Sequence, residues 1–202
     1  ANKSINLDKF TLDNKFIEWE IPAGKWDVIS FFMCNTGQKL ECPSPNSDGL
    51  IIDHLSSRAT KRDFDTMLTR LATVMTPENQ LKFLELDSYE VWAARDWTPD
   101  FLEQFKIRCG YDPKLFLPIL QGYRSKDSAL GERFLGDYHR LVSDMIIENH
   151  FSQSVEIANK NKIEMYSEAG HGGYARVDPL KALGNSHVPM GEFWNRQRFW
   201  VT

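Results

Sequence analysis

Three short apolar runs along the chain each give way to polar residues, a pattern typical of buried strands with polar tips. The runs lie at 81–90, 163–173 and 187–194, and each ends near a glutamate: Glu90, Glu168 and Glu192. The carboxyl ends of parallel strands collect at one edge of a sheet or one face of a barrel. We therefore expect these three glutamates to converge.

The remaining apolar positions between these runs recur mostly at helical spacing. They predict a helix over about 61–75 and a second helix that starts at Thr98-Pro99-Asp100 and stops at Gly110. A short helical piece follows and is expected to end near Pro118. The pattern over 132–161 fits either one long helix or two helices joined near His150.

The first 30 residues look β-rich. Residues 16–21 alternate and predict one strand, residues 22–24 form a turn, and residues 25–33 predict a second strand. We expect residues 1–24 to be a β-rich lead-in from a preceding domain. Residues 25–202 are then expected to be part of a (β/α) barrel catalytic domain.

Alternation of strands and helices indicates an α/β fold with a parallel sheet. Among such folds a TIM-like (β/α) barrel suits three polar-tipped strands that meet at one face. A complete barrel takes about 250 residues, and this chain has 202. The barrel is therefore expected to be partial, and the chain to be part of a larger enzyme.

Composition narrows the possible functions. With 42% hydrophobic and 26% charged residues the chain has an ordinary globular composition, and its net charge of −4 argues against a nucleic-acid partner. No apolar run reaches the roughly 18 residues of a membrane span. The N-terminal residues show no signal-peptide pattern. The cysteines and histidines lack the spacing of a zinc site, and a Cys34–Cys42 bridge is left open.

Carboxylates at the mouth of a barrel suit glycoside hydrolysis, in which one carboxylic acid protonates the leaving oxygen and a second carboxylate activates water or attacks carbon. Glu90, Glu168 and Glu192 are the main candidates, with Asp87 beside the first. A lone glutamate after a strand is more often a solvated or helix-terminal residue. The repeated context of these three favours the chemical interpretation.

Aromatic residues accompany the candidate carboxylates. Flat rings pack against the apolar faces of sugars, while their polar tips form hydrogen bonds. A loop histidine can also bind sugar hydroxyls. For any single aromatic residue, packing in the core is the commoner role, and for the histidine a loop position with no special role is an equal alternative. The candidates for substrate binding are Asp87, Tyr89, Trp92, His171 and Trp194.

A chain of short motifs then resembles the catalytic region of α-L-rhamnosidases of glycoside hydrolase family 106. The motifs are Asp87-Ser-Tyr-Glu90, Trp97-Thr, Gly110-Tyr-Asp112, Leu117-Pro118, Arg133-Phe-Leu135 with Asp137, Glu168-Ala-Gly170 and Pro189-Met-Gly-Glu-Phe-Trp194. Upstream, Thr36-Gly37, Gly49-Leu-Ile, Asp53 and Leu55-Ser56 also look like that family. The resemblance covers most of the chain from about residue 20 onward.

This resemblance implies a (β/α) barrel inside a longer polypeptide with β-sandwich domains, and inverting hydrolysis of terminal α-L-rhamnosyl residues. By motif, Glu90 becomes the general acid and Glu192 the general base, with the opposite assignment left open. Glu168 becomes the ligand of a calcium ion that holds vicinal sugar hydroxyls. The implied substrate is an oligosaccharide or polysaccharide, and the implied location is periplasmic or extracellular.

Two other functions remain in view. The first is a glycosidase for another deoxy-sugar or for a uronic-acid-containing polysaccharide, which the strand ends do not distinguish from a rhamnosidase. The second is a carbohydrate-binding or scaffold protein that keeps the fold without turnover. The three intact glutamates argue against the second. The sequence leaves the natural glycan and the oligomeric state open.

Overall fold

The computed structural model of the chain describes residues 4–12, 16–40, 43–91, 96–170 and 176–191. It divides into two compact units, each built from two separate segments of sequence. The helical unit comprises Ala1–Asn35 and Trp97–Leu141, and the sheet unit comprises Thr36–Asp96 and Val142–Thr202. The boundary predicted near residue 24 stays a prediction.

A small parallel sheet lies at the centre of the sheet unit. Its strands are β3 (Phe83–Leu86), β4 (Glu164–Glu168) and β5 (Val188–Met190), in the order β3-β4-β5. Leu86 pairs with Ser167, and Glu168 pairs with Met190. All three strands were predicted from sequence, and their parallel arrangement confirms a mixed helix and sheet fold.

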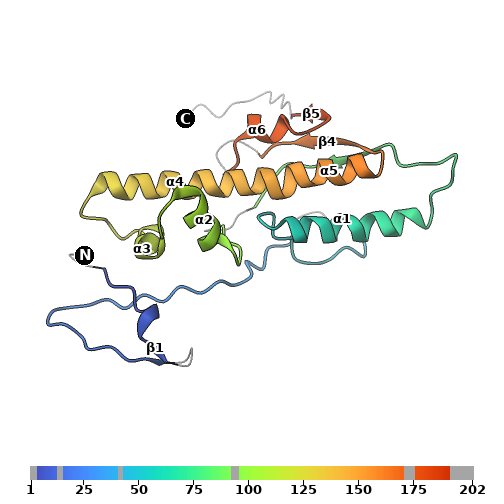
Figure 1. Cartoon of the computed structure of the whole chain (residues 1–202). Helices are drawn as coiled ribbons and strands as arrows, with labels where there is room; N and C mark the ends of the chain where they lie inside the picture. The colour runs from blue at the N-terminus through green and yellow to red at the C-terminus, as the bar shows by residue number, and fades with distance from the viewer. Residues whose placement is uncertain (1–3, 13–15, 41–42, 92–95, 171–175, 192–202) are drawn as a thin grey trace, which may run out of the picture. The chain divides into compact units, whose positions relative to one another are not determined.

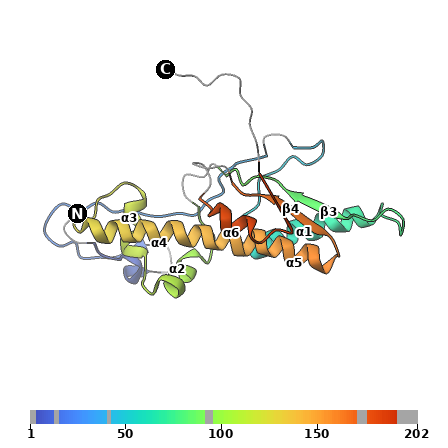
Figure 2. The same cartoon turned by 90° about the horizontal axis from the view of Figure 1, so that it is seen from above.

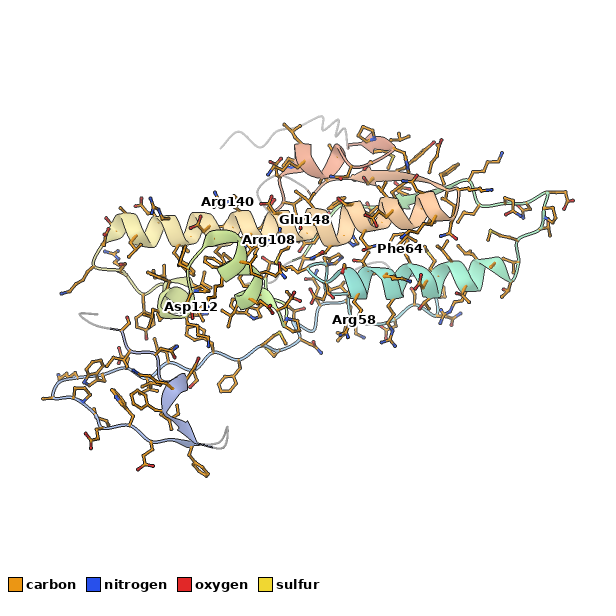
Figure 3. The ribbon with its side chains drawn as sticks, viewed as in Figure 1. Arg58, Phe64, Arg108, Asp112, Arg140 and Glu148 are labelled. Atoms are coloured by element: carbon orange, nitrogen blue, oxygen red, sulfur yellow. The ribbon has the colours of Figure 1, made fainter. Side chains whose placement is uncertain are left out.

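Helices pack on one face of this sheet. They are α1 (Ser57–Ala72) and α5 (Gln153–Lys160), and both views of the ribbon show β4 running alongside α5 (Figures 1 and 2). Phe64 of α1 lies between α1 and α5 (Figure 3). The buried core that joins helices and strands consists of Phe64, Ile157, Ala158, Ile163 and Met165.

Helix α1 begins earlier than the predicted residue 61 because its cap lies upstream. The Ser56 side chain accepts a hydrogen bond from the backbone N–H of Ala59 at 3.3 Å, as an N-cap residue does. The short helix α6 (Pro179–Leu183) is capped in the same way, since the Asp178 carboxylate accepts the backbone N–H groups of Leu180 and Lys181.

The segment predicted as one helix or two is a single helical rod with a π-helical turn. Helix α4 (Ser128–Ile146) leads into the turn η3 (Ile147–Ser152), which continues as α5. The carbonyl of His150 accepts a hydrogen bond from the Ser154 hydroxyl at 2.6 Å. Single π-turns inside helices frequently mark functional positions. Because α4, η3 and α5 follow one another without a break, the joint near His150 is a local change from α-helical to π-helical winding.

Aromatic rings fill the interior of the helical unit. Helix α2 (Phe101–Cys109) ends at Gly110, whose φ of +81° is the left-handed cap conformation that favours glycine. After it come η2 (Lys114–Phe116) and α3 (Leu117–Leu120). The core is lined by Phe101, Phe105, Phe134 and Tyr138, each at most 1% exposed.

The short helical piece expected to end near Pro118 ends at Leu120. Pro118 lies in the first turn of α3. A proline is tolerated there because the first N–H groups of a helix have no partner within the helix.

The N-terminal segment departs most from expectation. It contains the turn η1 (Asp8–Phe10) and the antiparallel pair β1 (Thr11–Leu12) and β2 (Phe16–Ile17). The strand predicted over residues 25–33 is wrong, since the described chain has no strand between β2 and β3. An apolar run becomes a strand only where a neighbouring strand pairs with its backbone groups. In this run the Phe32 side chain is 88% exposed, so it does not pack against a sheet.

None of the helices among the described residues combines the length and the apolar character that a membrane span requires.

Candidate active site at the carboxyl edge of the sheet

The carboxyl ends of β3, β4 and β5 lie along one edge of the sheet. Asp87 directly follows the Leu86–Ser167 pair, so the parallel register brings it level with Glu168, which itself pairs with Met190. Two of the sequence-predicted carboxylates are thus brought to neighbouring strands. The convergence of Glu90, Glu168 and Glu192 stays a prediction, since Glu192 lies outside the described residues.

Side-chain alternation places Glu168 on the sheet face away from the helices. Met165 and Ser167 are buried, whereas Tyr166 and Glu168 between and after them are only half-buried. Successive side chains of a strand point to opposite faces, so Tyr166 and Glu168 share one face. The Phe83 ring stacks on Tyr166 at 5.0 Å on that face. Glu168 therefore extends a surface that carries aromatic rings.

Glu90 is exposed and is held by neighbours on both its side chain and its backbone. The Ser88 hydroxyl donates to Glu90 Oε1 at 3.1 Å. The Gln38 amide donates to the Glu90 carbonyl at 2.8 Å. The Ser88 backbone N–H in turn donates to Asp87 Oδ1 at 2.8 Å. These contacts hold the segment that follows β3 and orient the Glu90 carboxylate.

Two histidine rings adjoin the segment that follows β3. The ring of His54 contacts the ring of Tyr89 and the ring of His150, in both cases edge to face. Burial lowers the pKa of His54 to about 4, and burial together with the nearby His54 lowers the pKa of His150 well below its usual value. Both rings are therefore neutral at pH 7. No motif spacing connects residues this far apart in sequence.

Strand β5 is tied to β4 by His187. Its backbone N–H donates to the Met165 carbonyl at 3.0 Å, and its Nδ1 accepts the Met165 N–H at 2.8 Å. Because Nδ1 accepts, Nε2 carries the proton and donates to Asn159 Oδ1 at 3.0 Å. This contact fixes the start of β5, the strand that leads toward Glu192.

An ion pair also links the ends of two segments beyond the sheet edge. Arg176 Nη1 lies 3.0 Å from Asp96 Oδ2, and the Asp96 side chain is only 6% exposed. Asp96 follows residues 92–95, and Arg176 follows residues 171–175. A partly buried pair of this kind stabilises the geometry of the chain at both positions. Its members are 80 residues apart, so no local sequence pattern predicts it.

The predicted site residues divide into two groups. The structure describes Asp87, Tyr89, Glu90 and Glu168, and all four lie at or just beyond the carboxyl ends of β3 and β4. Trp92, His171, Glu192 and Trp194 lie outside the described residues. The catalytic, substrate-binding and metal-binding roles of all eight stay predictions.

Three comparisons place this chain among known proteins. A family model described as alpha-L-rhamnosidase, glycoside hydrolase family 106, matches residues 2–200. A protein of Formosa agariphila named "Putative beta-glucuronidase" is 28% identical over 197 residues, which is 95% of this chain and 16% of that protein. The chain thus spans about one sixth of the length of this curated relative.

The fold is similar to that of a solved enzyme. The structure of a rhamnosidase from Novosphingobium sp. PP1Y matches with a TM-score of 0.73 and 23% identity, over 90% of this chain and 18% of that one. At this level of identity the likeness concerns the fold.

Proposed function

Since the chain belongs to glycoside hydrolase family 106, the α-L-rhamnosidases, we propose that it supplies the catalytic edge of an enzyme that releases terminal α-L-rhamnose from oligosaccharides or polysaccharides. The observation that carries the proposal is the parallel sheet, which brings Asp87 and Glu168 level on adjacent strands with Glu90 just beyond. Carboxylates gathered at such an edge are what glycoside hydrolysis requires.

In the proposed reaction Glu90 protonates the glycosidic oxygen as the bond to the leaving group breaks. Glu192 takes a proton from a water molecule, which attacks the anomeric carbon from the opposite face and inverts its configuration. The Ser88 hydroxyl, bonded to Glu90 Oε1, orients the Glu90 carboxylate for this transfer. The alternative assignment makes Glu192 the general acid and Glu90 the general base.

The proposal includes the rest of the family's architecture. The β3-β4-β5 sheet is taken as three neighbouring strands of a (β/α) barrel, a fold whose active sites lie at the carboxyl ends of its strands. The polypeptide is placed in the periplasm or outside the cell, where complex glycans are degraded.

A calcium ion fits the donors at this edge. Calcium takes six to eight oxygen ligands, drawn from carboxylates, carbonyls, waters and substrate hydroxyls. Glu168 offers a half-buried carboxylate, and Asp87 offers a second on the neighbouring strand. Among the described residues no group of three or more acidic, histidine or cysteine side chains forms a ready-made metal site. When bound, the ion would hold vicinal sugar hydroxyls and orient the ring, with Glu168 as its principal protein ligand.

Removal of calcium is expected to lower activity. Treatment of the natural polypeptide that contains this chain with a calcium chelator should reduce rhamnose release by at least about tenfold, because the sugar loses its template. Adding calcium back should restore the rate, and magnesium should not, because it prefers a smaller octahedral site. Glu168→Gln should raise the calcium concentration needed for half-maximal activity. Unchanged rates after exhaustive chelation would contradict the calcium proposal.

A second substrate class is favoured by one comparison, because the Formosa agariphila relative carries the name of a glucuronidase. A panel of aryl α-L-rhamnoside, β-D-glucuronide and α-L-fucoside separates the two candidates. We expect release from the rhamnoside only. Release from the glucuronide alone would move the proposal to uronic acids, and tight binding without release from any substrate would favour the non-catalytic alternative.

A further inference from the structure

Three rings form a stack inside the sheet unit that the proposed chemistry does not use. The His54 ring lies 5.1 Å from Tyr89 at an interplanar angle of 82°, and 4.4 Å from His150 at 89°. Tyr89 and His150 are 6% and 7% exposed. We call these three residues the ring stack. Edge-to-face packing at such distances has a preferred geometry, so each ring restricts the orientation of its neighbour.

The segment that carries His54 is itself firmly held. Asp53 Oδ1 accepts the backbone N–H of Leu55 at 3.0 Å, which forms a tight turn just before α1. The Asn149 side chain donates to the Leu55 carbonyl at 2.6 Å. Contacts on both sides of Leu55 therefore fix the backbone next to His54.

The π-helical turn positions the far end of the ring stack. Asn149 and His150 are consecutive residues of η3. Asn149 contacts Leu55 just before α1, and His150 contacts Thr60 in the first turn of α1. His150 Nδ1 lies 3.3 Å from the hydroxyl of Thr60, which is fully buried in α1. The altered winding of η3 thus accompanies two contacts to one segment. This gives the irregular turn a structural role.

Tyr89 connects the ring stack to the proposed catalytic edge. Its ring is buried, whereas the next side chain, Glu90, is exposed. Tyr89 and Glu90 share one planar peptide bond, so a fixed Tyr89 ring restricts the backbone from which Glu90 projects. Ser88 and Gln38 contact Glu90 directly, while the ring stack holds the residue before it.

We propose that His54 is a positioning residue, which packs edge-on between Tyr89 and His150 and thereby holds Glu90 in place at the carboxyl edge of the sheet. The inference rests on the proposed role of Glu90 in hydrolysis. Misplacement of a catalytic group by about 1 Å can cost up to about a hundredfold in rate. A clamp of three rings is suited to preventing such a displacement.

Three substitutions of His54 and one control test the proposal in the natural polypeptide. His54→Ala removes the central ring and should lower kcat on the α-L-rhamnoside at least about tenfold, with KM within about threefold of wild type. His54→Phe keeps a flat ring and should stay within about threefold of wild type. His54→Leu fills similar space without a ring and should resemble His54→Ala. The matched control is His139→Ala, which removes an exposed histidine that also packs edge-on against a tyrosine, Tyr138, at 5.3 Å.

Hydrogen–deuterium exchange of the peptide that spans residues 83–91 gives a second measurement that needs no activity. His54→Ala and His54→Leu should speed exchange in this peptide and leave the peptides of α2 unchanged, because only the local clamp is lost. Equal exchange in wild type and all three His54 variants, or equal loss of kcat in His54→Phe and His54→Leu, would overturn the proposal. Wild-type protein that releases no sugar would refute the proposed function. The exchange measurement would still show whether His54 holds the segment of residues 83–91 in place.

Discussion

Glu90→Gln is expected to reduce rhamnose release from an alkyl α-L-rhamnoside by about 10²–10⁴-fold, the usual contribution of a general acid. Glutamine keeps the shape of the side chain and its contact with Ser88, but it has no proton to donate to the leaving oxygen. Binding should persist, so KM should change little. A nitrophenyl rhamnoside should lose far less, since nitrophenolate departs without protonation.

The same pair of substrates decides the assignment of the two glutamates. Glu192→Gln should slow both substrates equally, because a general base acts on water whichever group leaves. The reverse pattern, in which Glu192→Gln spares the nitrophenyl substrate, would exchange the two roles. Glu85→Gln serves as the control, since Glu85 is an exposed glutamate of β3 outside the proposed machinery. If Glu90→Gln matches wild type on the alkyl substrate, Glu90 is not catalytic.

Acid is expected to destabilise the sheet unit between about pH 6.5 and pH 4 through His54. In the unfolded chain the histidine pKa is 6.5, whereas burial lowers the pKa of His54 to about 4 in the fold. Within this window the unfolded chain binds a proton that the folded chain does not, so the free energy of unfolding falls as pH falls. The loss for this one group is complete near pH 4 and reaches at most about 3 kcal/mol. His150, whose pKa is also lowered, adds in the same direction.

A variant without the titrating group separates this effect from the other acid-sensitive groups. Urea unfolding of wild type and His54→Phe, followed by tryptophan fluorescence, is measured at pH 7.0, 5.5 and 4.5. The stability of His54→Phe relative to wild type should rise by about 2 kcal/mol or more over that range, because phenylalanine has no proton to bind. A difference that does not change with pH would show that His54 is not held neutral by the fold.

Local patterns predicted those elements that local chemistry determines. The tips of β3, β4 and β5 follow from apolar runs that end in polar residues, and Gly110 ends α2 because its left-handed conformation suits glycine. The apolar periodicity predicts a start of α1 that is too late, because it does not include the Ser56 cap. The strand expected over 25–33 does not form. A strand needs a partner strand beside it, and the hydrophobic pattern alone does not show whether such a partner is present.

In the candidate site, too, the sequence predicts the residues that a local pattern marks and misses those that tertiary packing brings together. Carboxylates next to strand ends are visible in the hydrophobic pattern, so the sequence predicts that Asp87, Glu90 and Glu168 lie at or just beyond the ends of β3 and β4, as they do in the structure. Their roles stay predictions. The ring stack was not, since His54, Tyr89 and His150 come from three segments whose meeting depends on tertiary packing. The nearest signal was His150, which lies where the helical pattern of residues 132–161 was open to a break. A π-turn at that point is a change that hydrophobic periodicity alone does not resolve.

The most direct test of the central claim is proton NMR of an aryl α-L-rhamnoside during digestion by the natural polypeptide, observing which anomer of free rhamnose appears before mutarotation. Inverting hydrolysis by Glu90 and Glu192 predicts the β anomer first, with the two carboxyl groups about 6.5–9.5 Å apart to admit water. Appearance of the α anomer first would mean a retaining mechanism and would contradict the acid and base roles proposed for these glutamates.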